Sequence, residues 1–141
     1  MRALLDVNVL LALLDADHVD HRTARSWLES AIEHGWASCA ITQNSLVRVL
    51  TQERYPSPVS AAEATERLRR ATSTPYHRFL PCDLSVLDAS ILPDRIHGSR
   101  QVTDVYLLAL ALAHGCRLVT FDRAIPLSAV SGASPDHLLT L

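Results

Sequence analysis

The chain opens with the stretch Arg2-Ala3-Leu4-Leu5-Asp6-Val7-Asn8, in which a strand-like segment runs directly into an aspartate. Aspartates border strongly apolar segments twice more, in Val102-Thr103-Asp104-Val105 and in Val119-Thr120-Phe121-Asp122-Arg123. If these segments lie side by side around one parallel sheet, the three carboxylates meet. A hard divalent cation such as Mg²⁺ or Mn²⁺ relieves the repulsion among such carboxylates. A metal-loaded acidic cluster of this kind suits phosphodiester hydrolysis.

Each aspartate also has an ordinary structural explanation. An aspartate after a strand commonly forms an Asx turn, and one in the first turn of a helix commonly complements the helix dipole. The combination is more informative than its parts, because each residue borders an apolar segment in which an unpaired charge is costly. We therefore expect Asp6, Asp104 and Asp122 to form one site.

Composition predicts a single folded domain over residues 1–141. Hydrophobic residues make up 48% of the chain, which argues against disorder and supplies enough apolar side chains for a core. No apolar run reaches the roughly 18 residues of a membrane span. The N-terminus enters a strand without a cleavable signal segment, so we expect a cytoplasmic protein that does not contact membranes.

The charged residues, the cysteines and the histidines exclude some further classes of protein. The net charge is −2, which argues against a histone-like binder, and all 13 basic residues are arginine. The planar guanidinium group of arginine binds phosphate in a bidentate way that lysine cannot match. A GC-rich genome explains the same preference for arginine equally well. Cys39, Cys82 and Cys116 are widely spaced and predict reduced thiols. Only His18 and His21 share a helical turn, and they lack further ligands for zinc.

Strand-like and helical segments alternate along the chain. The apolar pattern predicts strands at residues 2–7, 36–41, 76–81, 116–121 and 137–141. It predicts helices at residues 9–14, 18–34, 42–54, 60–71, 83–92 and 104–114. Gly35 and Gly115 are expected to end two of these helices, and Thr42 and Thr103 to cap two others.

This alternation predicts an α/β protein. We expect a three-layer α/β/α sandwich with a central, mainly parallel sheet of four to five strands. Ligands of such sheets bind outside the carboxyl ends of the strands. Asp6 and Asp122 fall at such ends, and Asp104 opens a helix whose positive dipole end points toward the same edge.

With these features, the chain resembles the PIN-domain ribonucleases. Three of its blocks look like signature blocks of that family, namely Leu4–Val9, Thr103–Ala109 and Leu118–Arg123. A fourth block, Ile41–Leu50, is similar to one subset of the family, the VapC toxins of bacterial toxin–antitoxin pairs. The four blocks follow the family's order at plausible spacing, so the resemblance spans essentially the whole chain.

The resemblance implies a metal-dependent endoribonuclease with a PIN-like sandwich. In this family, one or two Mg²⁺ or Mn²⁺ ions activate a water and neutralise the phosphate during an in-line attack. Carried over by position, Asp6, Asp104 and Asp122 would be the catalytic and metal-binding carboxylates. Asn8 would orient Asp6 or a metal-bound water, and Thr120 would hydrogen-bond near Asp122.

The resemblance also points to two arginines and one departure from the family pattern. Arg48 and Arg123 are candidates for gripping RNA phosphate, although a surface arginine is more often simply solvated. The family usually supplies a glutamate from the helix after the second strand, whereas this chain has Gln43-Asn44-Ser45 there. Gln43 is the replacement by position. A neutral amide lowers the negative charge by one, which should weaken Mg²⁺ binding and disfavour a second ion.

The implied role is that of a toxin that cleaves structured RNA, either tRNA or ribosomal RNA, and so arrests translation. A VapB-like antitoxin would inhibit it by inserting its C-terminal segment into the acidic groove. Such toxins typically form homodimers. More apolar surface than one buried helix pair obviously needs is offered by Leu10, Leu11, Leu13, Leu14 and the apolar face around Trp27 and Leu28. For any single one of these residues, an ordinary core position is the simpler explanation.

Two other classes of function stay open. A phosphotransfer enzyme or receiver-like domain also gathers acids at the ends of parallel strands, but this chain has no lysine to contact a phosphoryl group. The second alternative is a PIN-like RNA-binding domain that is catalytically weakened by Gln43. RNA cleavage by a Gln43→Glu variant separates these interpretations.

Overall fold

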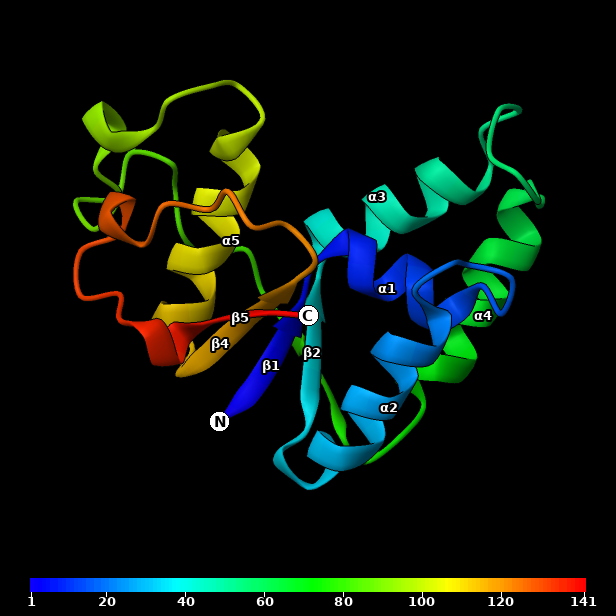
Figure 1. The fold of residues 1–141 in the computed structure, drawn as a ribbon. Coiled ribbons are helices and arrows are strands. Elements are labelled where there is room, and N and C mark those ends of the chain that lie inside the picture. Colours follow the sequence, from blue (N-terminus) through cyan, green and yellow to red (C-terminus); the bar gives the residue numbers. More distant parts are fainter.

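A computed structural model describes all 141 residues, and a five-stranded sheet forms its centre. The strands are β1 (Arg2–Leu5), β2 (Trp36–Cys39), β3 (His77–Leu80), β4 (Cys116–Thr120) and β5 (Leu138–Thr140). They are all parallel and lie in the order β3-β2-β1-β4-β5, with β1 in the middle (Figure 1). The predicted parallel α/β sheet is therefore confirmed.

Helices cover both faces of this sheet and complete the three layers (Figure 1). One face carries α1 (Val7–Leu14), α2 (His21–Ala31), α3 (Ala40–Leu50) and α4 (Ala61–Thr72), whereas α5 (Gln101–Ala113) covers the other face. Four short 3-10 turns complete the elements: η1 (Ile32–His34), η2 (Pro93–Arg95), η3 (Leu127–Ala129) and η4 (Pro135–His137). Crossing a bilayer would require a longer apolar helix than any in this structure.

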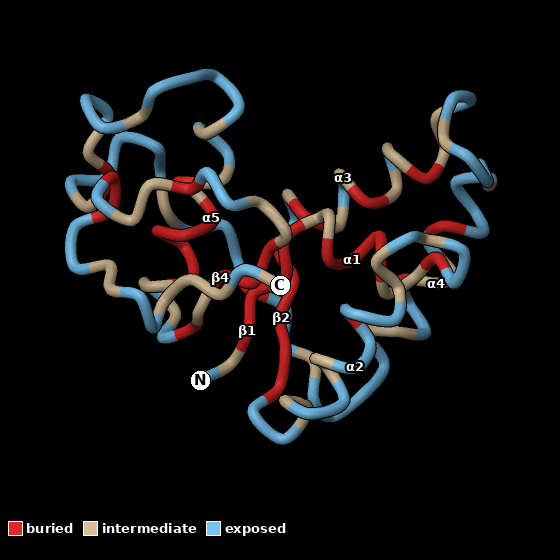
Figure 2. The backbone as a smooth tube through the Cα atoms, in the orientation of Figure 1, coloured by how far each residue is buried: buried red, intermediate tan, exposed pale blue.

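The central strand supplies side chains to two separate cores. Leu4 of β1 packs in one core with residues of α5 such as Leu108, while Leu5 packs in the other with residues of α1 such as Leu10. These four leucines are almost completely buried, and each contributes about 1.5–3 kcal/mol through burial of its side chain. Figure 2 shows the buried residues concentrated in the strands and on the inner faces of the helices. Burial on both faces explains the continuous apolar run of this strand.

Gly35 makes the turn that leads into β2. Its φ of 76° lies in the left-handed region, which favours glycine. A Cβ at this position would clash with the guanidinium of Arg2 and lie 2.9 Å from the carbonyl oxygen of Tyr76. The Arg2 guanidinium is held there because its Nη1 donates to the same Tyr76 carbonyl at 2.8 Å. Gly35 therefore ends the second helical segment, as predicted.

One predicted helix is absent. Residues 83–92 form a series of turns in place of the expected helix. Ser85 Oγ accepts from the backbone N of Leu87 at 3.1 Å, and Asp88 Oδ1 accepts from the backbone N of Ser90 at 2.9 Å. These side chains compete with helical carbonyls for the backbone donors, which favours turns over a helix.

Two helix starts also differ from the prediction. α5 begins at Gln101, so Thr103 lies inside its first turn and does not cap it. α3 begins at Ala40, and Thr42 acts from within the first turn, where its Oγ1 accepts from the backbone N of Cys39 at 3.0 Å. In both places the chain enters the helix earlier than the position of the threonine suggested.

Candidate active site

Asp6 occupies the carboxyl end of the central strand and begins α1. Its Oδ1 accepts a hydrogen bond from the backbone N of Val7 at 2.7 Å, and its Oδ2 accepts one from Thr120 Oγ1 at 2.7 Å. The residue is 4% exposed. Burial raises the pKa of Asp6, the hydrogen bonds from Thr120 and Val7 lower it, and the charge of Asp122 raises it. The strand-to-helix turn thus holds a buried carboxylate that is costly to ionise.

Thr120 ends β4 and connects several predicted site residues. Besides donating to Asp6, its Oγ1 accepts from Asn8 Nδ2 at 3.1 Å and from the backbone N of Asp122 at 3.0 Å. Asn8 Oδ1 in turn accepts from the backbone N of Phe121 at 3.2 Å. The hydroxyl is completely buried. It therefore couples the end of the first strand to the turn that follows the fourth.

Asp122 and Asp104 are held more loosely than Asp6. Asp122 Oδ1 accepts from the backbone N of Ala124 at 2.7 Å, which forms the Asx turn expected after a strand. Asp104 lies in the first turn of α5, and its carboxylate accepts no hydrogen bond from the protein. Burial, and then the charges of Asp6 and Asp122, raise the pKa of Asp104 to about 6. The carboxylates of Asp6, Asp104 and Asp122 therefore lie near enough for their negative charges to repel one another.

The chemistry of this donor set fits a hard divalent cation. Three carboxylates supply the oxygen ligands that Mg²⁺ and Mn²⁺ prefer, and a bound cation would relieve the repulsion that adds to burial in raising the pKa values of Asp6 and Asp104. The carboxylates are gathered less tightly than the sequence suggested, because no three His, Cys, Asp or Glu side chains lie close enough together to hold one ion. An ion shared among these acids would keep water ligands, as Mg²⁺ commonly does.

Gln43 belongs to a separate hydrogen-bonded group. Its Nε2 donates to Ser38 Oγ at 2.9 Å, and Ser38 Oγ lies 2.8 Å from His77 Nε2. Burial, together with the charge of Arg2, lowers the pKa of His77, which favours the neutral ring. The amide nitrogen of Gln43 thus supports β2 and β3, and its carbonyl oxygen has no hydrogen-bond partner in the protein. Only one feature of the sequence indicated the Ser38–His77 pair, namely that alternate side chains of a strand point to the same face of the sheet.

The two arginines singled out from the sequence are exposed. Arg48 lies on α3 and Arg123 directly follows Asp122. Neither side chain forms an ion pair, whereas several other arginines pair with glutamates, for example on α4. Both guanidinium groups are therefore available to an anionic ligand.

A family model for the PIN domain matches residues 3–131, a range that contains all three aspartates. The chain belongs to the PIN-domain family. Among PIN-domain proteins its curated relatives include Ribonuclease VapC44 of Mycobacterium tuberculosis, which is 62% identical, with 100% of both chains covered. Ribonuclease VapC38 of the same species is 40% identical, with 99% of both chains covered. The resemblance to PIN-domain VapC proteins inferred from the sequence is thus confirmed.

Solved structures of other PIN-domain proteins share the fold. VapBC2 from Rickettsia felis, solved bound to a promoter DNA fragment, matches with a TM-score of 0.58 at 14% identity, covering 86% of this chain and 89% of that one. VapC20 from Mycobacterium tuberculosis, described as a sarcin-ricin loop cleaving toxin, matches with a TM-score of 0.56 at 11% identity, covering 82% and 85%. At such low identity the similarity establishes the PIN fold alone.

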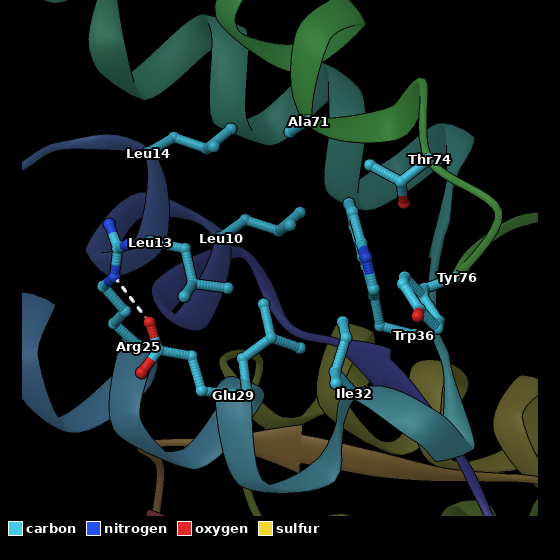
Figure 3. A pocket seen from close by; sticks show the side chains of 11 residues that line it. Leu10, Leu13, Leu14, Arg25, Glu29, Ile32, Trp36, Ala71, Thr74 and Tyr76 are labelled. Atoms are coloured by element: carbon cyan, nitrogen blue, oxygen red, sulfur yellow. Dashed lines mark hydrogen bonds and ion pairs between the residues drawn. The ribbon is translucent and has the colours of Figure 1, made fainter.

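This PIN domain also has an apolar groove that contains none of the predicted site residues (Figure 3). Its volume is about 400 Å³, and it lies between α1, α2, β2 and the segment from the end of α4 to β3. Leu10, Leu13, Leu14 and Leu28 are among its apolar lining residues, and Trp36 closes one wall. Part of the apolar surplus noted in the sequence therefore faces an open groove.

Proposed function

We propose that this chain is a Mg²⁺- or Mn²⁺-dependent endoribonuclease toxin of a type II toxin–antitoxin system. The observation that carries the proposal is the mutual charge repulsion of Asp6, Asp104 and Asp122, of which Asp6 and Asp122 follow strands and Asp104 lies in the first turn of α5. The PIN-domain match and the ribonuclease names of the curated relatives support the same activity.

The three acids share one task in this proposal. Asp6, Asp104 and Asp122 would hold the divalent ion together, in part through its water ligands, because the three carboxylates do not converge on one point. When bound, the ion would supply an activated water and neutralise charge on the phosphate. Thr120 and Asn8 keep Asp6 oriented through the hydrogen bonds described above. Because the Asp104 carboxylate has no protein donor, it is free to turn toward a ligand. Since its pKa is raised to about 6, Asp104 gives up its proton readily at neutral pH when a cation arrives.

Gln43 is assigned a supporting role outside the metal ligands. Its amide nitrogen is engaged with Ser38 and leaves only a neutral carbonyl oxygen for other contacts. With one negative charge fewer than the usual family pattern, the site favours one ion over two. Three acids therefore form the whole anionic part of the site.

We infer that the substrate is structured RNA, tRNA or ribosomal RNA, and that its cleavage inhibits translation. The guanidinium groups of Arg48 and Arg123 are exposed and form no ion pair, which supports contacts with RNA phosphate. The description of VapC20 as a sarcin-ricin loop cleaving toxin is a precedent for ribosomal RNA among structures with this fold. A cytoplasmic location stays a prediction.

A VapB-like antitoxin is the proposed protein partner, with a homodimer as a second assembly. The structure of VapBC2 from Rickettsia felis supports pairing with an antitoxin. The apolar groove offers a protein partner a surface lined by leucines on α1 and α2. An amphipathic helix fits such a groove by burying its apolar face.

The test is cleavage of total cellular RNA by the purified protein with Mg²⁺ or Mn²⁺. We expect discrete fragments that disappear with EDTA and in the Asp6→Asn variant. Asp17→Asn is the matched control, because Asp17 is exposed and its carboxylate makes no hydrogen bond. Intact RNA in every lane, from folded protein, would contradict the nuclease.

A second candidate function is RNA binding without effective cleavage. The observation in its favour is the neutral Gln43 at the position of the usual glutamate. A gel-shift assay with the same RNA separates the two functions, since a binding domain retains RNA at metal concentrations at which no fragments form.

A further inference from the structure

Gln101, the first residue of α5, bridges two loop segments of the chain. Its Oε1 accepts from the backbone N of His97 at 2.9 Å, and its Nε2 donates to the carbonyl oxygen of Ala124 at 3.0 Å. One contact lies in the loop before α5, and the other lies just after β4. Asp104 follows Gln101 by three residues, so the two side chains lie about one helical turn apart on neighbouring positions.

Ala124 continues this bridge to the second loosely held acid. Its backbone N donates to Asp122 Oδ1, while its carbonyl oxygen accepts from Gln101. The backbone N of Asp122 donates to Thr120 Oγ1, which itself donates to Asp6. A continuous path of hydrogen bonds therefore runs from the first turn of α5 to the buried carboxylate at the centre of the sheet.

The first turn of α5 has few other constraints. Its N-cap residue, Arg100, makes no capping hydrogen bond with its side chain, and the buried residues of the helix begin at Val105. The Gln101–Ala124 hydrogen bond is the one side-chain bond that joins this turn to the segment after β4. This hydrogen bond therefore links the turn that carries Asp104 to the turn that carries Asp122.

We propose that Gln101 is a positioning residue that sets the spacing between the Asp104 and Asp122 carboxylates and thereby their affinity for a divalent cation. This inference rests on the proposed function, since it assigns the cation to these acids. Gln101 acts through the backbone of Ala124 and does not touch the ion.

The test is the affinity of the Gln101→Met variant for Mn²⁺, measured by calorimetry without RNA. Methionine has nearly the length of glutamine but makes neither hydrogen bond, and position 101 is partly exposed, so the core is untouched. We expect affinity to fall by about two- to tenfold, the effect of losing one or two ordinary hydrogen bonds. Gln52→Met is the matched control, because the Gln52 side chain makes no hydrogen bond, and it should bind Mn²⁺ like the unmodified protein.

RNA cleavage provides a second readout that a purely structural role would not move. In the Gln101→Met variant, the Mn²⁺ concentration for half-maximal cleavage should rise by the same factor, and the rate at saturating Mn²⁺ should return to that of the unmodified protein. A variant that was only less stable would keep the original affinity per folded molecule.

The possible failures are distinguishable. Equal Mn²⁺ affinity of the Gln101→Met variant and the unmodified protein overturns the role of Gln101 and leaves the nuclease proposal intact. No Mn²⁺ binding by the unmodified protein overturns the metal-dependent nuclease, and the role of Gln101 with it.

Discussion

At the scale of single residues, the hydroxyl of Thr120 has more partners than any carboxylate near it. It contacts Asp6, Asn8 and the backbone of Asp122. A Thr120→Val variant keeps the shape but removes the donor to Asp6, so the pKa of Asp6 should rise further and disfavour the metal-binding form.

The expected result is a drop in Mn²⁺ affinity of about 10- to 100-fold, the usual cost of losing a partner of a metal ligand. Calorimetry measures this drop directly. Thr65→Val is the control, because Thr65 is exposed and its hydroxyl bonds only to carbonyls of its own helix. An affinity as high as that of the unmodified protein would remove Thr120 from the site.

The hydrogen bond between Gln43 and Ser38 allows a more specific prediction about Gln43 than its position in the sequence did. A Gln43→Glu variant removes the donor to Ser38 Oγ and adds a charge beside the Ser38–His77 pair. We expect stability to fall by about 1 kcal/mol, the net value of a hydrogen bond. Because three acids form the proposed site, the rate of RNA cleavage should change by less than about threefold, within the loss of one weak interaction.

The measurements are a urea unfolding curve and a metal-dependent cleavage assay. Gln52→Glu adds the same charge just beyond the C-terminal end of α3 and serves as the control. A large gain in cleavage that is specific to position 43 would show that the missing carboxylate belongs among the metal ligands after all.

The carboxylates were predictable because strand ends are easy to locate. Asp6 and Asp122 each follow an apolar strand, and Asp104 lies in the first turn of an apolar helix, so the parallel sheet and this helix bring them toward one edge. Gln101 was not predictable in this way. Its partner Ala124 lies 23 residues away in sequence, in a segment without regular structure. Only the conformations of two loops bring these residues together.

At the scale of elements, Gly35 limits how α2 and β2 are joined. Gly35→Ala places a Cβ against the Arg2 guanidinium and the Tyr76 carbonyl at a left-handed φ. We expect a loss of about 1–3 kcal/mol in the free energy of unfolding, the range for a strained backbone position. Gly98→Ala is the matched control, because nothing lies within 4 Å of a Cβ there.

Urea unfolding of both variants checks this prediction. If both alanine variants lose the same free energy of unfolding, the close contact at Gly35 does not affect stability. If Gly35→Ala alone is destabilised, the turn before β2 depends on glycine at this one position.

The elements themselves were predictable to different degrees. Strands and the longer helices follow their apolar periodicity, so their existence was clear from the sequence. The error at residues 83–92 has a local cause, since Ser85 and Asp88 bind nearby backbone donors. α1 starts at Val7, two residues before the expected position, because Asp6 already accepts the Val7 backbone N–H. The periodicity of apolar residues does not reveal such hydrogen bonds between side chains and the backbone.

At the scale of the whole molecule, the acidic site makes stability depend on pH. The pKa of Asp104 is raised to about 6, above its ordinary value in an unfolded chain. The folded state therefore binds this proton more tightly, and the stabilisation is complete below about pH 4 and is lost as the pH rises through about 6. Without metal, the protein should be more stable at pH 5 than at pH 7, by on the order of 1 kcal/mol.

Thermal unfolding in EDTA at a series of pH values measures this effect. Asp104→Asn should be flatter between pH 5 and pH 7, because the titrating carboxyl is gone. Saturating Mn²⁺ should reverse the trend, since an ion that binds only the folded state stabilises it most where the acids are ionised. A pH profile identical in the Asn variant would assign the effect to other groups.

The order of the strands also affects when this site comes into existence. β1 is made first, but it lies between β2 and β4, and the backbone N of Asp6 donates to Val119 on β4 at 3.0 Å. Thr120 of β4 lies 114 residues after Asp6 in the sequence. Because a chain grows from its N-terminus, Asp6 leaves the ribosome long before Thr120 does. A nascent chain that has not yet released β4 therefore carries Asp6 without the hydroxyl that holds it in place.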